Sequence, residues 1–150
     1  MKFEILKDKI DTLLFQKSTI GVKLQAICDL LEREISHYDW VGFYFKNGDK
    51  NELKLAQYTG EETEHTIIPF GKGICGQVAV TNKNFLVQDV SEQENYISCG
   101  WKVKSEVVIP IFVNEENVGQ IDIDSHTANI FSADDEEFLE FICKKVAKIL

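Results

Sequence analysis

Residues 105–125 read Ser-Glu-Val-Val-Ile-Pro-Ile-Phe-Val-Asn-Glu-Glu-Asn-Val-Gly-Gln-Ile-Asp-Ile-Asp-Ser. Two apolar runs, Ser105–Val113 and Gly119–Asp124, flank the polar segment Asn114–Asn117. Apolar runs of this length joined by a short polar turn are typical of a β-hairpin. The stretch therefore predicts two paired antiparallel strands.

A second hairpin is predicted upstream, where the aromatic-rich run Trp40–Lys46 is separated from Glu52–Tyr58 by the turn-forming residues Asn47-Gly48-Asp49. The segment between the hairpins contains further short elements. These are a strand at His65–Pro69, a short helix at Ile74–Thr81 and a strand at Phe85–Val87.

Apolar residues recur at helical spacing in segments 2–16 and 19–36. A third helix is predicted from Ser132, which is a good N-cap followed by first-turn acids, to Leu150. Because the strands come as hairpins and not as repeated crossover units, the fold class is α+β around an antiparallel sheet.

The 150 residues suit a single domain, 1–150. A net charge of −9 disfavours nucleic acid as a partner and gives no basic stripe for a membrane surface. No stretch has the form of a signal peptide, so we expect a cytoplasmic protein with free thiols. Two of the four cysteines, Cys28 and Cys143, lie among apolar residues of predicted helices and are interpreted as core.

The other two cysteines have more informative surroundings. Cys75 lies in Gly-Lys-Gly-Ile-Cys-Gly, and Cys99 lies in a polar connection of 17 residues. Long ordered loops are often functional. A thiolate set among acids that bind a cationic group suits redox chemistry on a small molecule, and candidate acids follow at Glu106, Asp122 and Asp124. The alternative for Cys75 is a small buried side chain without a chemical role.

Several candidates allow two interpretations. Asp122 and Asp124 alternate with isoleucines and so share one strand face, which either faces solvent or lines a cleft. Trp40 and Tyr44 also share a face, and they either pack in the core or surround a substrate. His65 is either a surface strand residue or a ligand or proton-transfer group near Cys75.

Other kinds of site are disfavoured. The three histidines are isolated and no Cys-x-x-Cys pair occurs, so no metal site is expected. The segment Gly71-Lys72-Gly73 lacks the spacing of a phosphate-binding loop.

Four strings in colinear order resemble the free methionine-(R)-sulfoxide reductases, which are small stand-alone GAF domains. The likeness extends over about residues 38–150, and the strings are Trp40–Tyr44, Ile68–Gly76, Ser105–Ile111 and Ile121–Ser125. The resemblance implies a GAF-like domain with the N-terminal and C-terminal helices on one face of the sheet and the short helix and loops over the other.

The resemblance also implies roles for individual residues. Cys99 matches the cysteine that attacks the sulfoxide sulfur, releases methionine and becomes a sulfenic acid. Cys75 matches a second cysteine that can form a disulfide with it. The implied reductant is thioredoxin or another dithiol, with no bound cofactor, and the implied assembly is a homodimer. The remaining matches line the substrate pocket: Glu106, Asp122, Asp124, Trp40 and Tyr44.

Two departures from the family pattern keep a second hypothesis open. The usual resolving cysteine, ten residues before Cys75, is replaced by His65, and Cys99 is followed by Gly100 and Trp101. Three acids near a thiol also disfavour its thiolate unless a cation such as Lys72 or Lys102 offsets them. The hypotheses are a free methionine-(R)-sulfoxide reductase and a non-catalytic GAF module that binds or senses a small molecule.

Overall fold

The computed structural model of the chain describes residues 2–96 and 102–150. Its strands form one antiparallel sheet in the order β3-β2-β1-β6-β5-β4. Both predicted hairpins are present, and their inner strands β1 and β6 pair with each other. The strands are β1 (Trp40–Lys46), β2 (Glu52–Thr59), β3 (Ile67–Pro69), β4 (Phe85–Val87), β5 (Ser105–Val113) and β6 (Glu116–Ser125).

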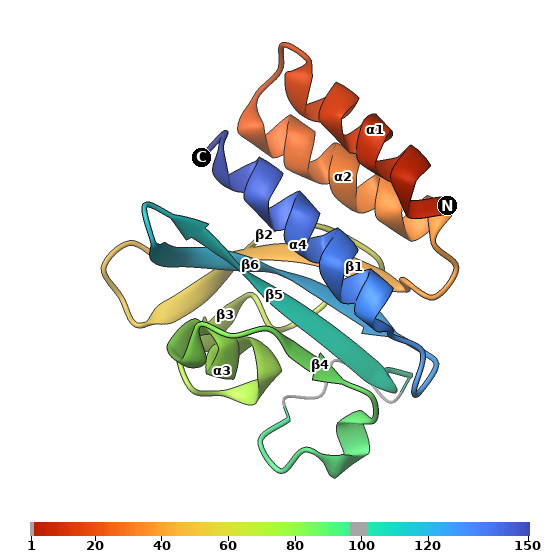
Figure 1. Ribbon diagram of the computed structural model, residues 1–150. Coiled ribbons are helices and arrows are strands. Elements are labelled where there is room, and N and C mark those ends of the chain that lie inside the picture. The colour runs from red at the N-terminus through yellow and green to blue at the C-terminus, as the bar shows by residue number, and fades with distance from the viewer. Residues whose placement is uncertain (1, 97–101) are drawn as a thin grey trace.

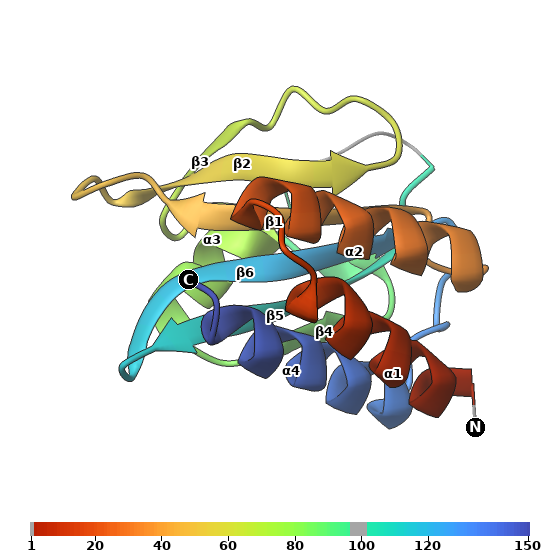
Figure 2. The same cartoon turned by 90° about the horizontal axis from the view of Figure 1, so that it is seen from above.

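The two faces of the sheet are covered differently (Figure 1). Helices α1 (Lys2–Phe15), α2 (Ile20–Glu34) and α4 (Ala133–Ala147) lie side by side on one face, as the view in Figure 2 also shows. The short helix α3 (Gly73–Thr81), the one-turn helix Val90–Glu92 and loops lie on the other. This is the predicted α+β layering.

Each face of the sheet has its own hydrophobic core because strand side chains alternate between the faces. On the helical face, Val41 and Phe43 of β1 and Ile121 and Ile123 of β6 are fully buried against the helices. On the α3 face, the intervening β1 residues Trp40 and Tyr44 join a smaller cluster that includes Val108 of β5 and Ile74, Cys75 and Val78 of α3.

The turn between β5 and β6 is shorter than predicted. β6 begins at Glu116, so only Asn114 and Glu115 connect the strands, and both have positive φ values, of 52° and 66°. Two left-handed residues form the type of turn whose twist matches a hairpin. The predicted four-residue turn is therefore wrong, because glutamate gives no sequence signal for this conformation.

Two other predicted boundaries also differ. β3 begins at Ile67, so His65 lies in the loop before the strand and not within it. Helix α4 ends at Ala147 and not at Leu150. Within residues 2–96 and 102–150, no helix combines the length and apolarity that a membrane crossing requires.

Helix α3 lies close to the sheet because Gly76 has no side chain. A Cβ atom at this position would lie 2.6 Å from the carbonyl oxygen of Pro69, which is closer than real contacts allow. The absence of a side chain allows this close approach, and a backbone hydrogen bond of 2.8 Å from Gly71 N to Gly76 O joins the two segments. This close packing positions the preceding residue, Cys75, over the central strands.

Candidate active site

The candidate acids lie in adjacent rows across the central strands. Asp124 of β6 pairs with Glu106 of β5 on one side and with Trp40 of β1 on the other. One step along β6, Asp122 pairs with Gly42 and Val108. Directly paired residues have neighbouring side chains on one face of a sheet. The register therefore brings Glu106, Asp122 and Asp124 together, on the face that α3 covers.

Cys75 reaches this acidic cluster from the opposite side. Its thiol donates to Asp122 Oδ2 at 3.3 Å, and its Sγ lies 3.9 Å from Glu106 Oε2. The amide of Gln120, which precedes Asp122 on the same strand face, donates to the Cys75 carbonyl at 3.1 Å. The cysteine and the acids are thus held in direct contact between α3 and the sheet.

The three acids are almost completely buried. Glu106 is 4% exposed, and Asp122 and Asp124 are each 2% exposed. The interpretation of Asp122 and Asp124 as a solvated outer face is therefore wrong, since α3 and its loops cover that face. Within residues 2–96 and 102–150, neither Asp122 Oδ1 nor Asp124 Oδ1 has a hydrogen-bond partner. Buried unpartnered carboxylate oxygens are uncommon in proteins, and a bound ligand, ion or water satisfies them.

Burial dominates the electrostatics of the cluster. It raises the pKa of Asp124 well above the usual carboxyl range, and the neighbouring charge of Asp122 raises it further. Burial likewise raises the pKa of Asp122, although hydrogen bonds with Glu106 and Cys75 act in the opposite direction. The pKa of the Cys75 thiol is also well above its ordinary value, because of burial and the charges of Asp122 and Glu106. Cys75 is therefore a thiol at neutral pH.

The aromatic candidates extend the same face. The Trp40 ring stacks on Tyr58 at a centroid distance of 5.6 Å and lies 6.3 Å from the Tyr44 ring. Their polar atoms have backbone partners: Trp40 Nε1 donates to the Glu61 carbonyl and Tyr44 Oη to the His65 carbonyl. Both rings belong to the core on the α3 face. Both rings therefore pack in the core, whereas their predicted contact with a substrate stays a prediction.

A small cavity lies beside Cys75. Its volume of about 20 Å³ is enough for one water molecule. Residues from several elements line it: Cys75, Glu106, Asp122, Tyr44, His65, Lys72, Gly73 and Ile74 of α3, and Ile68 of β3. His65 is half-buried and lines this cavity, so its interpretation as a surface strand residue is wrong. Lys72 lines it as well, whereas Lys102 donates to Glu61 at 2.9 Å.

The cysteine predictions have different outcomes. Cys28 and Cys143 are 0% and 4% exposed, and burial raises the pKa of both thiols, so both are core residues as predicted. Cys99, with the neighbouring Gly100 and Trp101, lies outside the described residues. Its predicted role therefore stays a prediction.

Sequence reasoning missed Gln120. It is fully buried, it positions the Cys75 backbone, and its Oε1 lacks a hydrogen-bond partner in the described part of the chain. The alternation of polar residues along this apolar strand indicated it, because every second position is polar at Gln120, Asp122 and Asp124.

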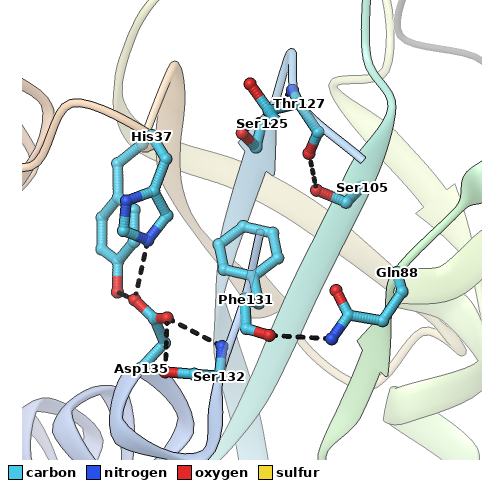
Figure 3. Close-up of polar contacts among 9 residues, drawn as sticks. His37, Gln88, Ser105, Ser125, Thr127, Phe131, Ser132 and Asp135 are labelled. Atoms are coloured by element: carbon cyan, nitrogen blue, oxygen red, sulfur yellow. Dashed lines mark hydrogen bonds and ion pairs between the residues drawn. The ribbon is translucent and has the colours of Figure 1, made fainter. Parts of the chain in front are cut away.

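A second buried polar cluster, on the helical side, has a different character (Figure 3). Asp135 of α4 accepts from Tyr38 Oη at 2.8 Å, and His37 Nε2 lies 2.9 Å from the same oxygen. Its second oxygen accepts from the backbone N–H of Ser132 at 2.9 Å, which completes a capping box. Both carboxylate oxygens are occupied, so this cluster is structural.

Comparisons with known proteins agree with this architecture. Residues 19–150 match the model of the GAF domain family. The free methionine-R-sulfoxide reductase of Saccharomyces cerevisiae is 38% identical over 73% of this chain and 62% of its own length. The free methionine-R-sulfoxide reductase of Escherichia coli is 31% identical over 81% of this chain and 72% of its own length.

A solved structure points to the same family. The free methionine-R-sulfoxide reductase of Neisseria meningitidis, in complex with its substrate, superposes with a TM-score of 0.92 over 98% of this chain and 87% of that chain, at 28% identity. Together with the sheet register and the buried cluster of cysteine and acids, these similarities show that the chain belongs to the GAF domain family, within the free methionine-(R)-sulfoxide reductase group.

Proposed function

We propose that this protein reduces free L-methionine-(R)-sulfoxide to methionine, with Cys99 as the nucleophile, as an antioxidant repair enzyme. The observation that carries the proposal is the buried acidic cluster with unpartnered oxygens on Asp122 and Asp124. A substrate ammonium group supplies the donors that these oxygens lack. The relatives named as free methionine-R-sulfoxide reductases support the same substrate class.

The remaining pocket residues suit the other end of the substrate. The ring surfaces of Trp40 and Tyr44 offer apolar contact for a methyl and thioether group, because their polar atoms already have backbone partners. Binding the ammonium among acids while the thioether end contacts aromatic rings would favour a free amino acid over a methionine within a protein, whose nitrogen carries no charge.

In the proposed first step, the Cys99 thiolate attacks the sulfoxide sulfur. The sulfoxide oxygen takes a proton and is transferred to Cys99, so that methionine leaves and Cys99 becomes a sulfenic acid. The sulfoxide is reduced by two electrons, and the thiol is oxidised by the same two. Because their pKa values are raised, Asp122 and Asp124 keep a proton to higher pH than an ordinary aspartate, which suits one of these carboxyl groups to proton donation.

In the second step, Cys75 attacks the Cys99 sulfenic acid, a disulfide forms and water leaves. The Cys75 proton has an acceptor in place at Asp122 Oδ2. A thioredoxin-type dithiol then reduces the disulfide and restores both thiols. Because Cys75 is buried and its pKa is raised, we expect this step to be slower than the first.

The direct test measures methionine released from the R-sulfoxide with dithiothreitol as reductant. We expect release by the wild type and none by Cys99→Ser, while the control Cys143→Ser keeps wild-type activity because that thiol lies in the helical core. Absence of release by the folded wild type would refute the reductase proposal and leave the binding module. With thioredoxin as reductant, Cys75→Ser should lose turnover that dithiothreitol still supports.

Homodimer formation and a cytoplasmic location belong to the same proposal. Exposed apolar side chains on the first two helices, Ile5, Phe15 and Val22, support pairing through helices. Light scattering after size-exclusion chromatography tests the assembly, and a monomer at micromolar concentration would contradict it.

A further inference from the structure

We propose that Cys75, Glu106 and Asp122 form a binding site for one thiophilic divalent cation of the Zn²⁺ type. The three residues come from α3, β5 and β6, and one potential ligand atom from each lies within 4.8 Å of the others. This site was not expected from the sequence, because the residues have none of the short Cys and His spacings of common zinc sites.

The distances between the ligand atoms fit a tetrahedral ion. Cys75 Sγ lies 3.3 Å from Asp122 Oδ2 and 3.9 Å from Glu106 Oε2. An ion bound at ~2.3 Å from sulfur and ~2.0 Å from oxygen at a tetrahedral angle separates those atoms by ~3.5 Å. These two separations lie on either side of this value, so shifts of a few tenths of an ångström suffice for them, and the two carboxylate oxygens lie within 4.8 Å of each other.

The site has space and an unused ligand atom. The same three residues line the cavity of about 20 Å³, which accommodates an ion or a water molecule. Asp122 is 2% exposed, and its Oδ1 lacks a hydrogen-bond partner among residues 2–96 and 102–150. This oxygen belongs to the same carboxylate whose Oδ2 contacts the thiol, and it is a second sign that this carboxylate takes a ligand.

The composition of the cluster also favours a cation. Cys75, Glu106 and Asp122 are three acidic groups whose potential ligand atoms lie within 4.8 Å of one another, and a bound divalent cation neutralises their charges. Because metal ligands must be deprotonated to bind, binding releases protons.

Ligand chemistry sets the selectivity. One thiolate with two carboxylates favours Zn²⁺, Cd²⁺ and Co²⁺ over Mg²⁺ and Ca²⁺, which prefer oxygen ligands alone. Three protein ligands leave a fourth position for water. A bound ion would occupy the acids proposed for the substrate ammonium, so cation and substrate exclude each other; this consequence rests on the proposed function.

The test is titration of the full-length reduced chain with Cd²⁺, followed by the ultraviolet thiolate-to-cadmium band, and with Zn²⁺ by calorimetry. We expect one ion per chain with proton release and no heat from Mg²⁺. Cys75→Ser should abolish the cadmium band and weaken Zn²⁺ binding at least tenfold. Asp122→Asn should weaken Zn²⁺ binding while keeping the band, which covers the case in which Cys75→Ser folds poorly.

Two control variants separate this site from other thiols. Cys143→Ser, whose thiol donates to the Ile109 carbonyl in the helical core, and Cys99→Ser should both bind the ion as the wild type does. Three results would each overturn the proposal. They are wild-type ion binding by folded Cys75→Ser, loss of the cadmium band in Cys99→Ser, and no stoichiometric ion binding by the wild type. These readouts need no turnover, so they stand even if the reductase assay fails.

Discussion

Two aspartates are buried to the same extent in different parts of this molecule. Asp135 and Asp122 are each 2% exposed. Asp135, on the helical side, accepts hydrogen bonds at both carboxylate oxygens, whereas Asp122, on the α3 side, keeps Oδ1 without a partner in the described residues. Burial of a charge is costly unless it is compensated. The comparison therefore separates a carboxylate that stabilises the fold from one whose burial is not compensated within the described residues, as expected for the proposed ligand-binding role.

The surroundings of the two aspartates explain this difference. Asp135 lies near the N-terminus of α4, where backbone N–H groups and the helix dipole favour a negative charge. Asp122 lies in the centre of a sheet beside Glu106 and Asp124, where nearby charges are of the same sign. The α3 side therefore contains a cluster of like charges that lowers stability, a pattern that is typical of functional sites.

The largest effect on stability is expected for Asp135→Ala. The change leaves the buried Tyr38 hydroxyl without its acceptor and removes the capping box, so we expect a loss of about 3 kcal/mol. This corresponds to a fall of ~6–12 °C in the melting temperature of a chain of this size. Thermal denaturation checks this, and a change below ~2 °C would mean that Asp135 is not structural.

Asp122→Asn should have the opposite profile. It removes a charge from a site crowded with acids, so we expect the unfolding free energy to rise by about 1 kcal/mol. Loss of the charge-assisted hydrogen bond to the substrate ammonium, worth ~2–3 kcal/mol, should lower kcat/KM by ~30- to 140-fold. Urea denaturation and the methionine-release assay measure the two quantities, and a destabilised but fully active variant would invalidate the distinction.

The pH dependence of stability sharpens the same comparison. Asp122 and Asp124 have pKa values raised by folding, so the folded state binds their protons more tightly than the unfolded state. Their contribution is fully present below about pH 4 and is lost as the pH rises through the raised folded values. The unfolding free energy measured from pH 4 to 8 should therefore fall less steeply for the double variant, Asp122→Asn with Asp124→Asn, than for the wild type. Parallel curves for the two proteins would contradict this.

The smallest effect is expected for His37→Ala. The imidazole contacts Asp135 at 2.9 Å, but the Tyr38 and Ser132 contacts remain when it is removed. We expect a loss of about 1 kcal/mol with unchanged kcat/KM. Reduced activity in this variant, at temperatures where it is folded, would show that the helical side communicates with the site.

Much of the architecture was predictable because it depends on local patterns. The apolar run Ser105–Val113 and the aromatic-rich run Trp40–Lys46 predicted strands with correct bounds, and helical spacing predicted the three long helices within a few residues. Two features were missed. Glu115 has a left-handed backbone conformation that is unusual for its residue type, and Gln120 belongs to the same polar alternation as Asp122 and Asp124 but was not included in the predicted site.

The site was predictable only in part. Alternation placed Asp122 and Asp124 on one face of their strand, and Trp40 and Tyr44 on one face of theirs, but periodicity does not tell whether a face is covered or that the two pairs lie on the same side of the sheet. That outcome depended on α3 packing over the sheet, which requires Gly76 to approach the Pro69 carbonyl. His65 likewise became a cavity residue because the strand after it starts two residues later than predicted.

The sequence by itself determined the elements, the α+β class and the residue types available for chemistry, because these follow from side-chain periodicity and turn propensity. Only the tertiary structure decided that β1, β5 and β6 bring their polar residues into adjacent rows and that Cys75 meets them from α3. The physical reason is that register and long-range packing depend on contacts between distant residues, 31 positions apart for Cys75 and Glu106 and 84 for Trp40 and Asp124, which no local pattern encodes.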